Sequence, residues 1–166
     1  SSLDPNFLFI NKGYNLRLSD PQASVGIVQL SKLNNYVDRR IEIANHFIKN
    51  IINSALLYEN IIFQKVLNNA KSSWFGFPVV FKKLHFEEIQ RLRKKLLDSK
   101  IETRPFLAGD FSLQPVNKKF DHLCFDSLSN IKFIHNKSFA LPCHQGITKA
   151  EVDKICKIIE QFLSKL

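Results

Sequence analysis

Apolar residues recur at steps of three and four positions through the first long segment of the chain. A helix with Asp20 as its N-cap and Pro21 in its first turn, running to about Ile52, accounts for this pattern. Its apolar stripe comprises Leu30, Leu33, Val37, Ala44, Phe47 and Ile51. At 1.5 Å per residue the helix would be on the order of 45 Å long, which suits a helix that bridges two domains.

Shorter runs rich in β-branched and aromatic residues follow the long helix. They predict strands at Asn60–Leu67 and Ser73–Phe81, and two more at Ile101–Phe106 and around Lys137–Leu141. Pro78 has no backbone donor, so the second strand is expected at a sheet edge or at a bulge.

Two further helices have clear sequence signals. Phe86–Asp98 carries Phe86, Ile89, Leu92 and Leu96 at helical spacing. The last helix opens with a capping box, Thr148 and Glu151, and its apolar stripe is Val152, Ile155, Ile159 and Phe162. Between them, Leu107–Asn130 has little periodicity and is expected to be irregular.

The order of these elements favours the α+β class. A long bridging helix is followed by a small, mostly antiparallel sheet packed against helices. The 166 residues leave room for one domain and a piece of a second, and 45% apolar residues can supply its core.

No apolar run approaches the ~20 residues needed to cross a bilayer, so a cytoplasmic protein without a membrane partner is expected. The three cysteines, Cys124, Cys143 and Cys156, form no CxxC pair. Buried reduced thiols are therefore the favoured interpretation, and neither a metal nor an iron–sulfur site is expected.

The net charge of +9 suits a polyanionic partner, but the basic residues are mostly scattered lysines. One cluster, Arg91–Lys95, lies on the predicted helix at Phe86–Asp98. A solvated helix face is the favoured interpretation of this cluster, and no nucleic-acid partner is expected. A basic nucleic-acid-binding domain stays open as a minor alternative.

Four stretches, in order, resemble the C-terminal part of the pyridoxal-phosphate-dependent (PLP-dependent) nucleotide-sugar enzymes of the DegT/DnrJ/EryC1/StrS type. They are GYNLRLSDPQASVGIVQLSKL with the downstream pair Arg39 and Arg40, then SSWFGFPV, TRPFLAGDFSLQP and ALPCHQGITKAEVDKI. The second and third are similar to the subgroup of 3-dehydrases that act on 4-keto-6-deoxy nucleotide sugars, and to their aminotransferase relatives. Asp110 and Gln145 depart from that subgroup, which often has Asn and Pro there.

The resemblance implies an aspartate-aminotransferase-like fold, in which a large cofactor domain precedes a small α+β domain. Residues 1–19 would be the end of the large domain and the interdomain loop. Residues 20–166 would be the small C-terminal domain with its bridging helix, and the N-terminal PLP-binding domain would be absent. This chain alone is then expected to be inactive and to contain no catalytic residue.

The resemblance also implies roles for three residues. Asn15 matches the family asparagine that reaches across a homodimer interface to the cofactor phosphate of the neighbouring subunit. Arg17, in the same loop, is a candidate for the substrate's diphosphate or sugar, because a guanidinium can hold a phosphate through two parallel hydrogen bonds. Arg104 is a candidate for substrate or interface contacts. The alternatives are an asparagine that serves the turn and two surface arginines.

The resulting hypothesis is the C-terminal portion of a PLP-dependent enzyme that acts on a nucleotide-linked 4-keto-6-deoxy sugar in deoxysugar or surface polysaccharide synthesis. Transamination and 3-dehydration both stay open. The alternative from another class is a non-catalytic protein-interaction module derived from the same fold.

Overall fold

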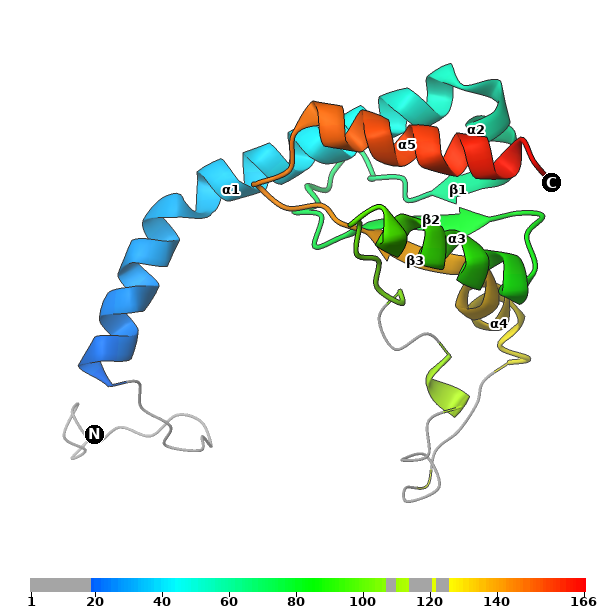
Figure 1. Ribbon diagram of the computed structural model, residues 1–166. Coiled ribbons are helices and arrows are strands. Elements are labelled where there is room, and N and C mark those ends of the chain that lie inside the picture. Colours follow the sequence, from blue (N-terminus) through cyan, green and yellow to red (C-terminus); the bar gives the residue numbers. More distant parts are fainter. Residues whose placement is uncertain (1–18, 107–109, 114–120, 122–125) are drawn as a thin grey trace. The chain divides into compact units, whose positions relative to one another are not determined.

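The computed structural model describes residues 19–106, 110–113, 121 and 126–166. The chain divides into two compact units, residues 1–34 and 35–166. The elements, in chain order, are α1 (Asp20–Asn53), α2 (Ala55–Asn60), β1 (Ile61–Phe63), β2 (Phe77–Phe81), α3 (Phe86–Asp98), the 3-10 turn η2 (Phe111–Leu113), α4 (Ser129–Lys137), β3 (Ser138–Leu141) and α5 (Lys149–Leu163) (Figure 1).

The predicted long helix is confirmed, with a different cap. Helix α1 begins at Asp20, and the backbone N–H and hydroxyl of Ser19 both donate to Oε1 of Gln22, at 3.1 Å. The Ser19 carbonyl accepts from the Ala23 N–H at 3.0 Å, so Ser19 holds the N-cap position and the prediction of Asp20 as N-cap was wrong by one position. Apolar burial in α1 is confined to the second unit, where Ile43, Ala44, Phe47 and Ile51 are buried. Leu30 and Leu33, at the other end of the predicted stripe, are exposed.

The sheet has three antiparallel strands in the order β1-β2-β3, so β2 is central. The expectation that Pro78 marks an edge or bulge was therefore wrong. Its partner in β3 is Ala140, whose N–H and C=O both bond to Arg104 instead. The side of Pro78 that lacks a donor consequently faces β1, and β1 ends at Phe63, opposite Val79. No ladder hydrogen bond is lost at the proline.

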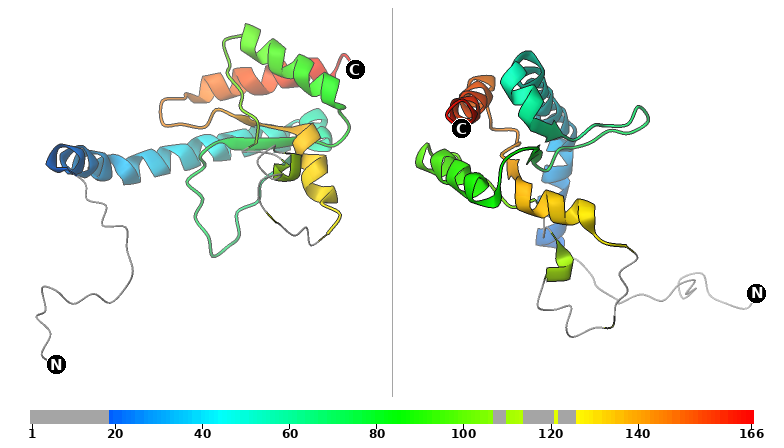
Figure 2. Two further views of the ribbon diagram at one scale, coloured as in Figure 1. Left: turned by 90° about the horizontal axis from the view of Figure 1, so that it is seen from below. Right: turned by 90° about the vertical axis from the view of Figure 1, so that its right-hand side faces the viewer.

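Helices cover one face of the sheet and form the core with it. The rings of Phe47 in α1 and Phe77 in β2 stack with centroids 4.8 Å apart. Helix α5 lies alongside the second half of α1 and runs parallel to it, and α3 lies beside α5 (Figures 1 and 2). The other face carries Pro78 and Val80, which share a small apolar cavity with Ile134 of α4.

The α+β fold class is confirmed, while three local predictions need correction. The strand predicted at Ile101–Phe106 is a single bridge between Arg104 and Ala140. Helix α4 begins at Ser129, inside the segment expected to be irregular, and none of its residues is buried, so it has no strong apolar stripe. Helix α2 was not predicted, and Ser54 caps it by accepting a hydrogen bond from the Leu57 N–H at 3.3 Å.

Within the described residues, no helix is both long and apolar enough to cross a membrane.

Candidate functional site

A cavity of about 1150 Å³ opens in the second unit. Four segments far apart in the sequence form its wall: the turn before β2, the segment that leaves α3, the loop after β3, and the first turns of α5. Three of the four stretches that carry the family resemblance therefore meet here: SSWFGFPV, the start of TRPFLAGDFSLQP, and ALPCHQGITKAEVDKI.

Arg104 lies in this wall, held by its backbone. Its N–H donates to the Ala140 carbonyl at 3.1 Å, and its own carbonyl accepts from the Ala140 N–H at 2.7 Å. The side chain is 73% exposed, and its Nε lies 3.7 Å from Oε1 of Glu102, two residues earlier in the chain. A guanidinium on a fixed backbone, loosely paired and open to solvent, is available to an anionic ligand.

The turn before β2 is tightly anchored on both sides of Phe75. The Trp74 N–H donates to Oγ of Ser72 at 3.3 Å, and the Trp74 ring is buried and stacked on Phe77 with centroids 5.5 Å apart. A side chain at Gly76 would place its Cβ 3.3 Å from Cβ of Ala140, so glycine permits the close approach to β3. Phe75 itself is exposed.

The chain leaves α3 through a Schellman motif. The Ile101 N–H donates to the Leu96 carbonyl at 2.9 Å, and the Lys100 N–H donates to the Leu97 carbonyl at 2.8 Å. Lys100 occupies the left-handed position of the motif, with φ of 65°, where glycine is usual. A lysine is thus held in an unfavourable backbone conformation at the cavity wall.

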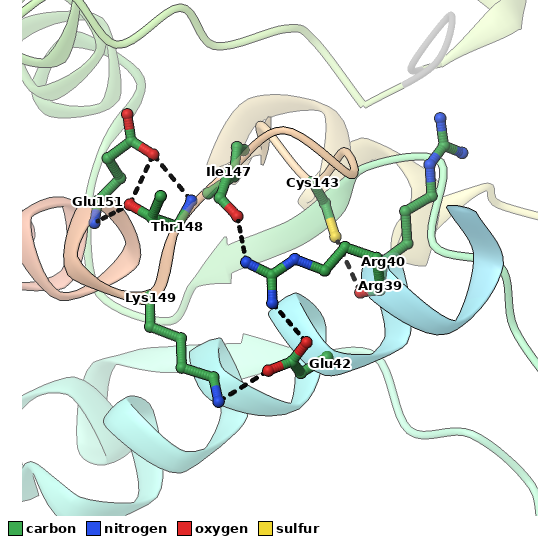
Figure 3. Close-up of polar contacts among 8 residues, drawn as sticks. All are labelled: Arg39, Arg40, Glu42, Cys143, Ile147, Thr148, Lys149 and Glu151. Carbon is green, nitrogen blue, oxygen red and sulfur yellow. Dashed lines mark hydrogen bonds and ion pairs between the residues drawn. The ribbon is translucent and has the colours of Figure 1, made fainter. Parts of the chain in front are cut away.

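The loop between β3 and α5 is clamped to α1 (Figure 3). Arg39 donates from Nη2 to the Ile147 carbonyl at 3.0 Å and pairs through Nη1 with Glu42. Glu42 also pairs with Lys149 of α5, at 2.7 Å. Hydrogen bonds from Lys149 and then from Arg39 lower the pKa of the Glu42 carboxyl. These contacts position the loop that carries His144 into the cavity wall.

Two more interactions order the same loop. The predicted capping box is confirmed: the Glu151 N–H donates to Oγ1 of Thr148 at 3.3 Å, and the Thr148 N–H donates to Oε2 of Glu151 at 2.8 Å. The Gly146 N–H donates to Nδ1 of His144 at 3.1 Å. Since Nδ1 is the acceptor, a neutral His144 carries its proton on Nε2.

Cys143 lies in the loop as a buried thiol, and its Sγ donates to the Arg40 carbonyl at 3.5 Å. Burial raises the pKa of Cys143 to about 11. Cys156 in α5 is likewise buried, and burial raises its pKa to about 12. Both are inert thiols at neutral pH, as the sequence predicted. Cys124 lies outside the described residues.

Of the predicted site residues, Asn15 and Arg17 lie outside the described residues, and only Arg104 is placed. Sequence reasoning missed Phe75, Lys100 and His144 as wall residues. Asp110 is 1% exposed: its Oδ1 accepts from the N–H and hydroxyl of Ser112, and its own N–H donates to Nδ1 of His135 at 3.1 Å. An Asp thus serves the local turn at the position where the subgroup often has Asn.

Among the described residues, two carboxylates line the cavity. The cavity's two carboxylates, Glu102 and Glu151, pair with Arg104 and with the cap of α5, so neither is set to hold a pyridine nitrogen. The same part of the chain holds no cluster of three or more metal-ligating side chains.

The basic cluster Arg91–Lys95 is largely occupied by contacts within the protein. Arg91 lies 3.6 Å from Glu88, and Nε of Arg93 donates to Oγ1 of Thr103 at 3.1 Å. Nζ of Lys95 lies 5.9 Å from the centre of the Phe162 ring. These contacts are those of a solvated structural helix face.

Known proteins are similar to this chain in sequence and in fold. Residues 3–160 match the model of the DegT/DnrJ/EryC1/StrS aminotransferase family. The lipopolysaccharide biosynthesis protein RfbH of Salmonella typhimurium is 29% identical over 160 residues, which are 96% of this chain and 36% of that protein. The GDP-4-keto-6-deoxy-D-mannose 3-dehydratase of Yersinia pseudotuberculosis is 29% identical over 164 residues, covering 96% of this chain and 40% of that enzyme.

The structural comparison agrees with these matches. The crystal structure of GDP-4-keto-6-deoxymannose-3-dehydratase with a trapped PLP–glutamate geminal diamine has a TM-score of 0.76 and 26% identity, covering 92% of this chain and 38% of that one. The chain thus spans 36 to 40% of the length of these relatives. Because the family model covers most of the sequence, the chain belongs to the DegT/DnrJ/EryC1/StrS aminotransferase family.

Proposed function

We propose that this chain is the C-terminal portion of a PLP-dependent enzyme that acts on a nucleotide-linked 4-keto-6-deoxy sugar, as an aminotransferase or a 3-dehydratase. The pathway would be the synthesis of deoxysugars for surface polysaccharide. Relatives named as a lipopolysaccharide biosynthesis protein and a 3-dehydratase support this, as does the share of their length that the chain spans.

The convergence of three family-like stretches on one cavity carries the proposal. These stretches are separated by tens of residues along the chain, yet all contribute to the wall that contains Arg104. A guanidinium that is exposed in a cavity and held on a fixed backbone suits the diphosphate of a nucleotide sugar. Substrate binding is therefore the role proposed for Arg104.

The remaining parts of the site would come from outside the described residues. Residues 20–166 would act as the small domain and residues 1–19 as the end of the large one. Asn15 would donate to the cofactor phosphate of the partner subunit in a cytoplasmic homodimer, and Arg17 would contact the substrate. PLP, when bound, would supply the electron sink for chemistry at the sugar's keto carbon or at the carbon next to it. On this proposal the chain alone is inactive.

The cofactor test uses the coding sequence upstream of Ser1. If it continues in frame, the longer protein should purify with the visible absorbance of PLP, and Asn15→Ala should weaken its cofactor affinity. A longer protein without bound PLP, or an unchanged affinity in the variant, would contradict the proposal.

The substrate test uses the same longer protein with GDP-4-keto-6-deoxymannose. Arg104→Ala should raise KM by about tenfold or more, since a hydrogen-bonded charge is lost, while Arg104→Lys should recover part of the loss. Arg91→Ala, which removes an exposed arginine outside the cavity, is the matched control and should leave KM unchanged. Equal KM values for the Arg104 and Arg91 variants would remove the substrate role.

One observation favours the interaction module as a second candidate. The N-terminal half of α1 exposes five large apolar residues, namely Val25, Ile27, Val28, Leu30 and Leu33. A start codon directly ahead of Ser1, together with self-association that is lost when Ile27 and Leu30 are changed to Ser, would support a module instead of an enzyme.

A further inference from the structure

Phe75 has the most exposed ring among the large apolar side chains of the described residues, at 77%. Its two neighbours are fixed, Trp74 by burial and stacking and Gly76 by its close approach to Ala140. Phe75 thus lines the cavity from an ordered turn with its side chain exposed, and keeping a phenyl ring in water is unfavourable. A ligand with a flat apolar face would remove that cost.

Backbone strain gathers at the same wall. Three described residues other than glycine have left-handed backbones, and two of them, Trp74 with φ of 49° and Lys100 with φ of 65°, line the cavity. Such strain is disfavoured for side chains of this size and is typical of ligand sites. The strained Trp74 directly precedes Phe75, and the strained Lys100 is itself a residue of the cavity wall.

The charges of the wall suit an anion beside the ring. Lys100, Arg104 and Lys154 line the cavity with Glu102 and Glu151, and both carboxylates already have partners inside the protein. The wall thus holds three cations and two carboxylates beside an aromatic ring, and this combination suits a nucleotide, because the ring can stack on the base and the cations can hold the phosphates.

We propose that the cavity binds the nucleoside diphosphate part of a ligand, with Phe75 as the stacking platform for the base and Lys100 as a phosphate contact. This inference rests on the proposed function for its ligand class and deepens it by naming two residues. An apolar protein segment is the competing occupant, and the cations beside Phe75 argue against it.

The first test uses the 166-residue chain with GDP and with inorganic pyrophosphate as probes. Trp74, the chain's one tryptophan, adjoins Phe75, so its fluorescence should report a base that binds there. GDP should bind more tightly than pyrophosphate and perturb Trp74. Phe75→Ala should weaken GDP binding between about fivefold and 150-fold, and Phe75→Tyr should keep most of the affinity. Leu67→Ala, which changes another exposed apolar residue outside the cavity, is the matched control.

The second test separates lost contact from lost folding. Lys100→Gly removes the ammonium group and also relieves the left-handed backbone, so the variant should melt at a higher temperature. It should nevertheless bind GDP and pyrophosphate about tenfold more weakly. Lys157→Ala removes an exposed lysine of α5 outside the cavity and should leave both affinities unchanged.

Three outcomes would overturn the inference. They are equal affinities for GDP and pyrophosphate, no binding of either at millimolar concentration, and a Phe75→Ala variant that changes self-association but not GDP affinity. Each is distinct from failure of the proposed function, which is decided by the PLP absorbance and substrate KM of the longer protein.

Discussion

Cys143 and Cys156 show how burial alone sets the chemistry of a residue here. Neither thiol has a cationic hydrogen-bond partner that would favour its thiolate, and burial is the largest cause of the raised pKa of each. Arg40 lowers the Cys143 pKa only in part. The two thiols therefore act as small apolar groups in the core and not as nucleophiles or ligands.

This burial predicts a pH dependence of stability in the alkaline range. The unfolded thiols titrate near 9.0, whereas the folded ones titrate at about 11 for Cys143 and about 12 for Cys156. The stabilisation from the protonated thiols is complete below pH 9 and is lost as the pH rises through the folded values. The free energy of unfolding, measured in urea from pH 8 to pH 10.5, should fall more steeply for the native chain than for a Cys143→Ala, Cys156→Ala variant. Parallel curves would contradict the assignment.

At the scale of elements, α1 and α5 are fastened together by polar contacts as well as by the core. Nε2 of His46 lies 2.7 Å from Oδ1 of Asp153, and the Asn50 amide donates to the same oxygen at 2.9 Å. Both contacts lower the pKa of the Asp153 carboxyl, and the hydrogen bond from Asn50 has the larger effect. Further toward the N-terminus, Arg39 and Glu42 hold the loop that leads into α5. The cavity wall thus depends on the two helices staying in register.

Arg39→Ala tests this clamp. It removes the bond to the Ile147 carbonyl and one partner of Glu42, and it should lower the free energy of unfolding by about 1 kcal/mol, since the guanidinium is partly exposed. Because the Glu42 pKa is lowered, its share of the effect is present above pH 4.5 and is lost as the pH falls through the folded value. The difference from the native chain in urea unfolding should therefore be smaller at pH 3 than at pH 7. Arg39→Lys, which keeps the charge, should lose less.

At the scale of the molecule, the two units differ in what holds them. Every buried apolar residue of the described chain falls between Ile43 and Leu163, so the core belongs to the second unit. The helix residues before Asn35 are solvent-exposed. The described part of the first unit, residues 19–34, thus contributes no buried residue to the core.

A truncated chain that begins at Asn35 should therefore keep cooperative unfolding in urea, with a free energy within about 1 kcal/mol of the full chain. A deeper truncation that begins at Ser54 removes Phe47 and its stacking contact with Phe77, and it should not fold. Loss of cooperative unfolding in the shorter truncation would show that residues 1–34 contribute to the core after all.

Local signals predicted those elements whose burial is periodic. Helix α3 has the predicted bounds, and α5 begins after the predicted Thr148 cap, because each pairs a cap with an apolar stripe that faces the core. Helix α4 was not predicted, because none of its residues is buried and it therefore has no periodic apolar stripe. Pro78 was placed wrongly because sequence does not reveal where the neighbouring strand β1 stops.

For the candidate site too, some features could be predicted from the sequence and others could not. The family could be predicted from short motifs, since residue types at fixed spacing carry that information, whereas the substrate role of Arg104 stays a prediction. The exposure of Phe75 depends on the close approach of Gly76 to Ala140. The left-handed backbone of Lys100 depends on how α3 ends. By itself the sequence determined the fold class and the family, because periodicity and motifs are local. Only the tertiary structure decided which distant segments share the cavity wall, because the packing of the sheet against its helices brings them together.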